Sequence, residues 1–199
     1  MLMVTRSHGA SLIELMIGIV IMAFLVAMGF PAYTSYMENS KVRSAAETFM
    51  ALAQMARGEA VHGNRPVQFV LTSDPATPAS KDTGNFDPTA FNWIVRSLND
   101  DNATFTFVEG KMAAEGAGSA AGTHVQIGGS GLAVVTYTGL GTTTLPTDAT
   151  FAFTNPTGGA CAPAGPIRCL NVIISVGGQN RMCDPAAPAG VGDSRSCTN

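Results

Sequence analysis

Residues 9–30 have the sequence GASLIELMIGIVIMAFLVAMGF, and Pro31 follows at once. This segment decides the fold because, over residues 12–30, the only ionisable side chain is that of Glu14. At 1.5 Å per residue, a helix of this length is about 28 Å long, close to the thickness of the hydrocarbon core of a bilayer. The sequence therefore predicts one membrane-spanning helix near the N-terminus.

The flanking charge predicts how this helix is oriented. The short segment before it carries Arg6, and basic flanks stay on the cytoplasmic side, so the rest of the chain is expected outside the cytoplasm. Two alternatives are a secretory signal peptide, with the weak cleavage sequence AMG at residues 27–29, and a plain membrane anchor. Neither explains Glu14, because a carboxylate in a membrane helix is costly unless it has a partner.

Outside this segment, charge is also sparse. Of the 199 residues, 13% are charged and 46% apolar, whereas about a quarter of an ordinary soluble domain is charged. The chain has 11 basic and 14 acidic side chains and no run of like charge, which argues against a strongly basic nucleic-acid-binding protein. Its length allows one compact domain with an appendage, and is too short for two full catalytic domains.

A new N-terminus just before the apolar segment would supply a partner for Glu14. Cleavage after Gly9 makes Ala10 the first residue, four residues before Glu14. The sequence GASLIEL at residues 9–15 resembles the prepilin processing motif of type IV pilins and type II secretion pseudopilins. Pilins often have Phe at the position of Ala10. Ala10 is therefore a departure from the common pattern, and the family tolerates it.

The resemblance implies roles for four residues. In this family the prepilin peptidase cleaves after the glycine, methylates the new N-terminus and leaves the helix in the product. Cleavage is thus expected between Gly9 and Ala10, with N-methylation of Ala10. Glu14 corresponds to the family's assembly residue, and Pro31 falls where these helices commonly kink.

The helix is predicted to continue past Pro31 to His62, and the sequence GNRP at residues 63–66 is expected to end it. Arg43 and Glu47 are four residues apart and are expected to pair on its exposed face. Apolar residues recur at steps of three and four, and we expect this stripe to pack against the chain's own globular part: Val42, Ala45, Phe49, Leu52, Ala56 and Ala60.

After residue 66 the pattern becomes alternating, which predicts strands. Trp93 is expected in the core, and the segments 73–88 and 110–131, rich in turn-forming residues, are predicted to be mobile loops. The predicted strands are residues 67–71, 92–98, 104–108, 132–137, 149–153 and 169–176.

Short motifs in this β-rich part narrow the resemblance. The chain contains WIV at 93–95, TGLG at 138–141, FAF at 151–153, RCLNV at 168–172 and GQNRMC at 178–183. Their order after a long helix resembles the GspH/FimT/FimU group of minor pilins and pseudopilins, over nearly the whole chain. The resemblance implies a type IV pilin-like α+β fold, in which a long N-terminal helix packs on a β-rich head.

The same resemblance implies a domain organisation and a location. We expect a leader at 1–9, a transmembrane assembly helix at 10–31, an amphipathic half-helix at 32–63 and a head at 64–199. The chain would cross the inner membrane once, keep its head in the periplasm, and enter a pilus or pseudopilus on assembly. Its partners would be other minor pilins and the major pilin, contacted through the N-terminal helix.

All four cysteines lie among the last forty residues, and we expect disulfides because the head is placed outside the cytoplasm. A structural zinc site is the alternative, but no closely spaced Cys pair supports it. Of the three pairings, Cys161 with Cys169 and Cys183 with Cys197 are favoured, because each closes a short loop containing Pro and Gly.

No catalytic motif is found, and neither an enzyme nor a cofactor is predicted. His62 and His124 have no partner at metal-binding spacing, and the doublet Asp100–Asp101 fits a solvated turn. The glycine-rich segments lack the pattern of a phosphate-binding loop.

Three functions remain. The first is a minor type IV pilin that primes assembly and joins a complex at the pilus tip, and the second is a minor pseudopilin of a type II secretion system. The third is DNA uptake, as in the FimT subgroup, whose Gly-Arg-x-Arg motif is matched here only by Gly178 and Arg181. Arg168 and Arg195 are the other basic residues near the tail, and the processed chain would carry ten basic against fourteen acidic side chains, so DNA binding is the least favoured.

Overall fold

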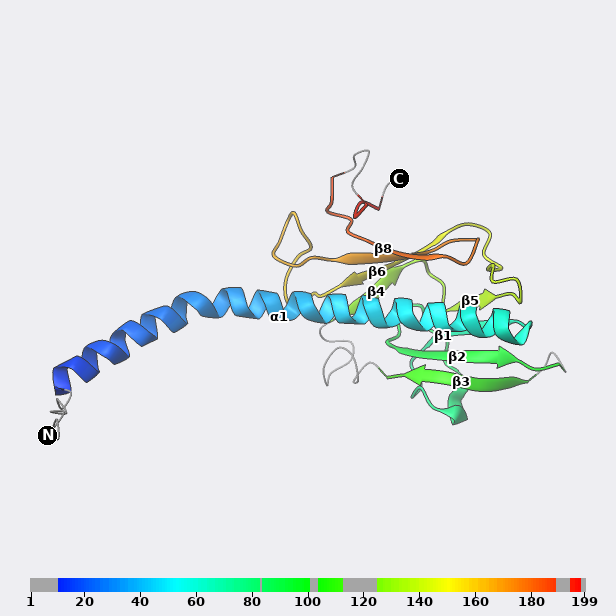
Figure 1. Ribbon diagram of the computed structural model, residues 1–199, viewed down its shortest axis with the longest axis horizontal. Coiled ribbons are helices and arrows are strands. Elements are labelled where there is room, and N and C mark those ends of the chain that lie inside the picture. Colours follow the sequence, from blue (N-terminus) through cyan, green and yellow to red (C-terminus); the bar gives the residue numbers. More distant parts are fainter. Residues whose placement is uncertain (1–10, 83, 101–103, 113–124, 189–193, 198–199) are drawn as a thin grey trace, which may run out of the picture. The chain divides into compact units, whose positions relative to one another are not determined.

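The computed structural model describes residues 11–82, 84–100, 104–112, 125–188 and 194–197 (Figure 1). Its contacts divide the chain into two compact units, Met1–Tyr36 and Met37–Asn199. The helix α1 (Leu12–Gly63) is continuous and contributes residues to both units. A single long helix that passes Pro31 was predicted and is confirmed.

Both ends of α1 are capped. At its start, the Ser11 hydroxyl accepts a hydrogen bond from the backbone N–H of Glu14 (3.4 Å), the arrangement of an N-cap residue. At its end, Asn64 has a φ of 48°, and the N–H of Arg65 bonds the carbonyl of Ala60 at 3.2 Å. Because a residue in the left-handed conformation terminates many helices, the GNRP sequence ends the helix as predicted.

Within the second unit, α1 buries the predicted apolar stripe. All six of its residues, from Val42 to Ala60, are at most 6% exposed. On the exposed side, Arg43 Nε lies 2.7 Å from Glu47 Oε1, which confirms the predicted pair. An exposed pair at this spacing contributes only about 0.3–0.5 kcal/mol, so burial of the stripe holds this part of the helix in place.

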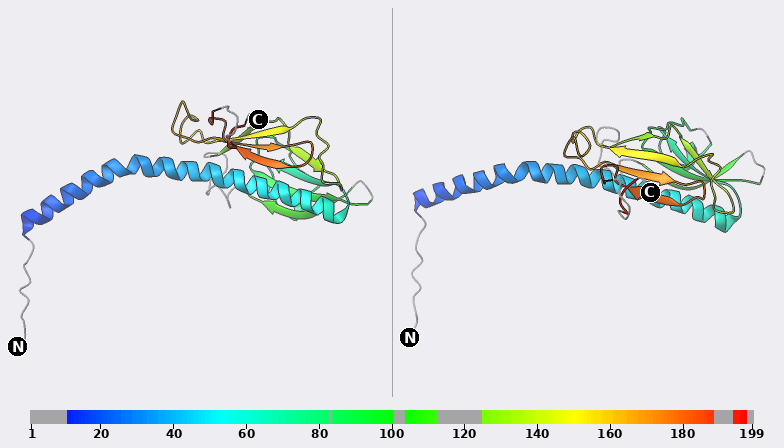
Figure 2. Two further views of the ribbon diagram at one scale, coloured as in Figure 1. Left: turned by 45° about the horizontal axis from the view of Figure 1, so that its top comes forward. Right: turned by 90° about the horizontal axis from the view of Figure 1, so that it is seen from above.

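Two antiparallel sheets, of four strands each, complete the second unit (Figure 2). A short 3₁₀ helix, η1 (Pro78–Ser80), lies in the loop after β1. The first sheet has the order β3 (Phe105–Lys111), β2 (Asn92–Leu98), β1 (Val67–Thr72) and β5 (Val134–Tyr137). The second has the order β4 (Gln126–Gly129), β6 (Ala149–Thr154), β7 (Leu170–Ile174) and β8 (Asn180–Cys183).

Two strands correct the sequence-based prediction. Strand β4, together with the end of β3, lies inside residues 110–131, which were predicted to be a loop. Val125 and Ile127 are buried and alternate with more exposed residues, and β4 pairs with β6. This burial and pairing outweigh the effect of the high glycine content, which disfavours a strand. Strand β8 was not predicted because the sequence NRMC has no apolar alternation; four residue pairs with β7 hold it.

Phe49 of α1 joins the two sheets. Its ring centroid lies 4.8 Å from that of Phe69 and 5.6 Å from that of Trp93 in the first sheet. It also lies 4.9 Å from that of Phe151 and 5.3 Å from that of Phe153 in the second sheet. Trp93 is 4% exposed, so its predicted place in the core is confirmed. Aromatic side chains therefore form the centre of the core.

Tyr137 is a second connection between the two sheets. Because it is buried, we expect the protein to lose stability at alkaline pH. It is fully buried, its hydroxyl donates to Asn180 Oδ1 at 3.2 Å, and burial raises its pKa to about 12. In the unfolded chain Tyr ionises near pH 10, so the free energy of unfolding should fall as the pH rises from about 10 to 12, by about 3 kcal/mol. Denaturant unfolding across this range should show the slope in the wild type and lack it in Tyr137→Phe; equal slopes would contradict the assignment.

Candidate functional site

The first unit presents an apolar helix with no protein covering it. Among the described residues, α1 is the one helix long and apolar enough to cross a membrane, judged by length and composition. Its most apolar window has a mean hydropathy of 2.5, and none of that window is buried. Apolar side chains in this segment, such as Phe24 and Leu25, are more than 60% exposed. Such a surface requires lipid or other apolar helices around it.

Glu14 is the only charged residue among positions 11–37. It lies in the first turn of α1 and is exposed, and an acidic side chain there interacts favourably with the helix dipole. Within the described part of the chain, no cation forms an ion pair with its carboxylate. The carboxylate is thus available for a charged partner. Gly9 and Ala10, which carry the predicted cleavage site and methylated amine, lie outside the described residues.

One face of this segment forms an apolar groove with small residues along it. A Cβ at Gly18 would meet no other atom within 4 Å, so this face is open. Membrane helices pack closely where small side chains let backbones approach. In the sequence, the i, i+3 and i+4 spacing of small and apolar residues is the signal that indicates this face. The lining residues are Leu15, Gly18, Ile19, Met22, Ala23, Val26, Ala27 and Phe30.

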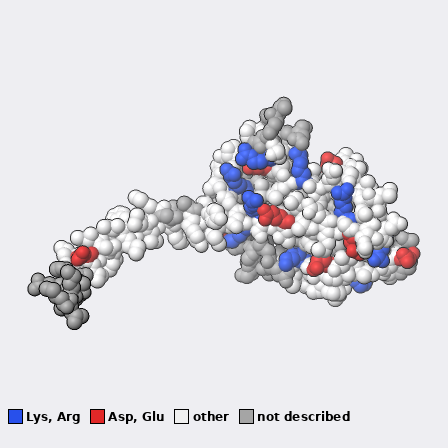
Figure 3. Space-filling view, viewed as in Figure 1, with Lys and Arg blue, Asp and Glu red and all other residues white. Residues whose placement is uncertain are grey.

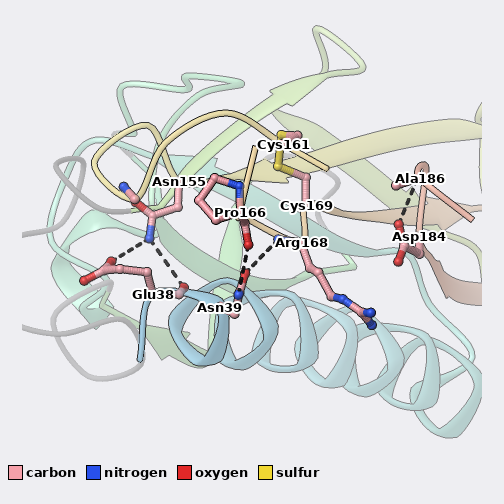
Figure 4. Close-up of a disulfide and its surroundings, with 10 residues drawn as sticks. Glu38, Asn39, Asn155, Cys161, Pro166, Arg168, Cys169, Asp184 and Ala186 are labelled. Carbon is pink, nitrogen blue, oxygen red and sulfur yellow. Dashed lines mark hydrogen bonds between the residues drawn. A yellow bond between two sulfur atoms is a disulfide. The ribbon is translucent and has the colours of Figure 1, made fainter. Parts of the chain in front are cut away.

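Where α1 enters the second unit, a loop of the head is fastened to it by polar contacts (Figure 4). Asn155 Nδ2 donates to Glu38 Oε2 at 2.7 Å, and the Glu38 carboxylate also accepts from Lys41 Nζ at 2.7 Å. At the next residue, Asn39 Oδ1 accepts from the backbone N–H of Arg168 at 2.7 Å, and Asn39 Nδ2 donates to the carbonyl of Pro166 in the same loop. We call these contacts of Glu38 and Asn39 the polar latch. Its partners are more than 110 residues apart in sequence, so no local pattern predicts it.

Loss of the buried amide in the polar latch should destabilise the head. Asn155 is 1% exposed, and its replacement by alanine removes a hydrogen-bond donor at 2.7 Å from the Glu38 carboxylate. We expect Asn155→Ala to lower the free energy of unfolding by about 2 kcal/mol. Denaturant unfolding of the full chain in detergent measures this, with Gln126→Ala at an exposed site as the control. A change no larger than that of the control would show that the latch contributes nothing to stability.

Two disulfides are present, Cys161–Cys169 and Cys183–Cys197, in the pairing that the loop lengths favour. The first closes the loop of the polar latch (Figure 4). The second attaches the C-terminal tail to the end of β8. Among the described residues, no group of three or more His, Cys, Asp or Glu side chains is placed to hold a metal ion.

The structure separates the three arginines proposed for DNA. Arg181 is half-buried, and its guanidinium donates to the carbonyls of Ser196 and Cys197 at 3.3 and 3.4 Å, so it fastens the tail. Arg168 and Arg195 are exposed. On the face of the head that Figure 3 shows, Lys and Arg atoms are interspersed with Asp and Glu atoms. His62 is exposed in the last turn of α1 and Asp100 lies in a turn, whereas His124 and Asp101 lie outside the described residues.

Comparison with known proteins agrees with this architecture. The family model of the type II transport protein GspH matches residues 45–178 of the chain. None of the curated protein sequences matches it. The crystal structure of the type IV minor pilin FimU from Pseudomonas aeruginosa is similar, with a TM-score of 0.52 and 23% identity over 78% of this chain and 97% of that one. The structure of the minor pseudopilin EpsH from the Type 2 Secretion System of Vibrio cholerae has a TM-score of 0.44 and 12% identity, over 74% of this chain and 98% of that one.

Proposed function

This chain belongs to the GspH family of minor pilins and pseudopilins, and we propose that it is an accessory subunit of a type IV pilus. In this role it primes assembly and joins a complex of minor pilins near the tip. It contributes structure rather than catalysis. Its partners are other minor pilins and the major pilin.

The observation that carries this proposal is the first unit of the chain. Over residues 12–30 the apolar helix contains one carboxylate, that of Glu14, which forms no ion pair among the described residues. None of the most apolar window of this helix is buried. A plain anchor needs no carboxylate, and burying one is favourable only with a partner charge. Assembly of many such helices side by side provides both the apolar surroundings and the partner amine.

Maturation precedes assembly in this proposal. The prepilin peptidase cuts between Gly9 and Ala10 and methylates Ala10, and the chain remains in the inner membrane with its head in the periplasm. The Glu14 carboxylate then compensates the positive charge of an N-terminal amine, either that of its own chain or that of a neighbouring subunit. Pro31 allows the helix to bend where it leaves the membrane, since proline removes one backbone hydrogen bond.

A second candidate is the equivalent minor pseudopilin of a type II secretion system. The name of the matched family supports it, because that family is described as a type II transport protein. Both functions need the same helix and the same processing, so they differ in partners alone. DNA uptake is not proposed, because Arg181 is engaged with the tail and useful affinity for DNA needs several phosphate contacts.

Purification of a tagged full chain from its native membrane, after mild cross-linking, tests the proposal. We expect it to carry other minor pilins and the major pilin with it. Recovery with a secretin and the secretion ATPase components would favour the second candidate. A chain recovered without any pilin-type subunit would contradict both.

A further inference from the structure

A polar groove lies on the head beside the last turns of α1. It has a volume of about 780 Å³, and one wall is formed by α1 and the other by the turn between β7 and β8. No acidic side chain is among its lining residues, which are Gln54, Arg57, Gly58, Val61, His62, Gly178, Gln179 and Asn180. Three of these residues belong to the GQNRMC motif at 178–183, but the proposed function does not use the groove.

Arg57 is the principal charge of the groove. It is half-buried, and its Nε donates to the carbonyl of Gly141 at 2.9 Å. That bond holds the guanidinium in place, but it does not compensate the charge. In the part of the chain that the structure describes, no carboxylate forms an ion pair with Arg57. A held guanidinium with free N–H groups favours binding of a carboxylate.

The position of Arg57 is built by close backbone packing. Gly141 and Gly178 have φ values of 78° and 76°, a region that other residues rarely adopt. A Cβ at Gly178 would clash with the carbonyl oxygen of Gly141. The turn after β5 and the turn after β7 therefore meet beside Arg57, near the end of α1 (Figure 1).

Exposed apolar side chains occur in the segments that form the groove or adjoin it in sequence. Val61, which lines the groove, is 52% exposed, and Val176, two residues before Gly178, is 41% exposed. Leu140, which precedes Gly141 in the turn, is 86% exposed. Exposed aliphatic residues next to a cation fit a protein segment better than a nucleic acid, which would need several cations along its backbone.

We infer that this groove binds a neighbouring pilin-type subunit through a segment that places an Asp or Glu carboxylate on Arg57 and an apolar side chain beside Leu140. The inference rests on the proposed function, because the subunit that binds the groove belongs to the same proposed assembly. It adds a head-to-head contact that is separate from the packing of the N-terminal helices. Charge complementarity selects the segment, and Leu140 and Val61 supply apolar contact area.

Photo-cross-linking tests this contact. A photoreactive residue at Gln179, which is exposed and lines the groove, is placed in the tagged full chain in its native host, with Glu109 on β3 as the control position. We expect Gln179 to cross-link to a pilin-type subunit at a segment containing Asp or Glu. The yield should fall about tenfold in Arg57→Gln, the effect of losing one hydrogen bond between charged groups.

Further variants separate binding from folding. Arg57→Lys keeps the charge and should retain more of the cross-link than Arg57→Gln, and Leu140→Ser changes only an exposed side chain and should also reduce the yield. Charge exchange, with Arg57→Glu and the partner's carboxylate changed to Arg, should restore it. Three results would overturn the groove contact alone. The chain could be recovered with pilin-type subunits but give no cross-link from Gln179, it could cross-link to nucleic acid, or the yields could be equal in all variants. Failure to recover any such subunit would overturn the proposed function as well.

Discussion

Replacing Glu14 with alanine is expected to abolish incorporation of the chain into a filament while leaving cleavage after Gly9 intact. The amine of a mature N-terminus, buried in the helical bundle, would lose its counter-charge. Breaking a buried ion pair by removing one partner costs about 3–5 kcal/mol, so incorporation should fall by more than about a hundredfold. Quantitative mass spectrometry of sheared filaments, relative to the chain left in the membrane, measures this ratio.

Glu47 supplies the matched control. It is an exposed carboxylate on the same helix, paired with Arg43 across one turn, and Glu47→Ala should leave incorporation unchanged. Glu14→Gln should behave like Glu14→Ala, because the amide has the size of the carboxylate without its charge. Incorporation of either Glu14 variant at the level of Glu47→Ala would show that the pairing account is wrong.

The largest loss of stability is expected at Phe49. Its ring is fully buried and meets aromatic rings of both sheets at centroid distances of 4.8–5.6 Å. Phe49→Ala removes these contacts and leaves a cavity, so the free energy of unfolding should fall by about 4 kcal/mol. Denaturant unfolding of the full chain in detergent, followed by the fluorescence of Trp93, measures the change.

Met55 is on an exposed side of the same helix, and its side chain is 45% exposed. Met55→Ala should therefore change the free energy of unfolding by no more than about 0.5 kcal/mol. If the two variants differed by less than about 1 kcal/mol, the central role of Phe49 in joining the sheets would be contradicted.

Local signals predicted most of the fold. The apolar segment, the stripe from Val42 to Ala60 and the GNRP sequence predicted α1, because helix periodicity and caps are properties of neighbouring residues. Strands β4 and β8 were not predicted, because their sequences, QIGG and NRMC, have little strand preference of their own. Pairing with β6 and β7 makes them strands, and that information lies in partners distant in sequence.

Some of the functional residues can likewise be recognised in the sequence, whereas the contacts of others exist only in the folded chain. Glu14 was found because a single carboxylate in an apolar helix is visible in the sequence. Arg181 was counted as a free cation, whereas the structure uses it to bond the carbonyls of Ser196 and Cys197. The contact between Glu38 and Asn155 joins residues 117 apart, and Arg57 with Gly141 joins residues 84 apart. Only the folded backbone brings such groups together.

The most direct test of the central claim is the mass of the mature N-terminus. In the proposed mature protein, the apolar helix stays on the chain, and a free, methylated amine precedes Glu14 by four residues. Mass spectrometry of the protein extracted from membranes should show a chain that begins at N-methylated Ala10. An N-terminus at Phe30, as a signal peptide would leave, or an uncleaved chain beginning at Met1, would contradict the account.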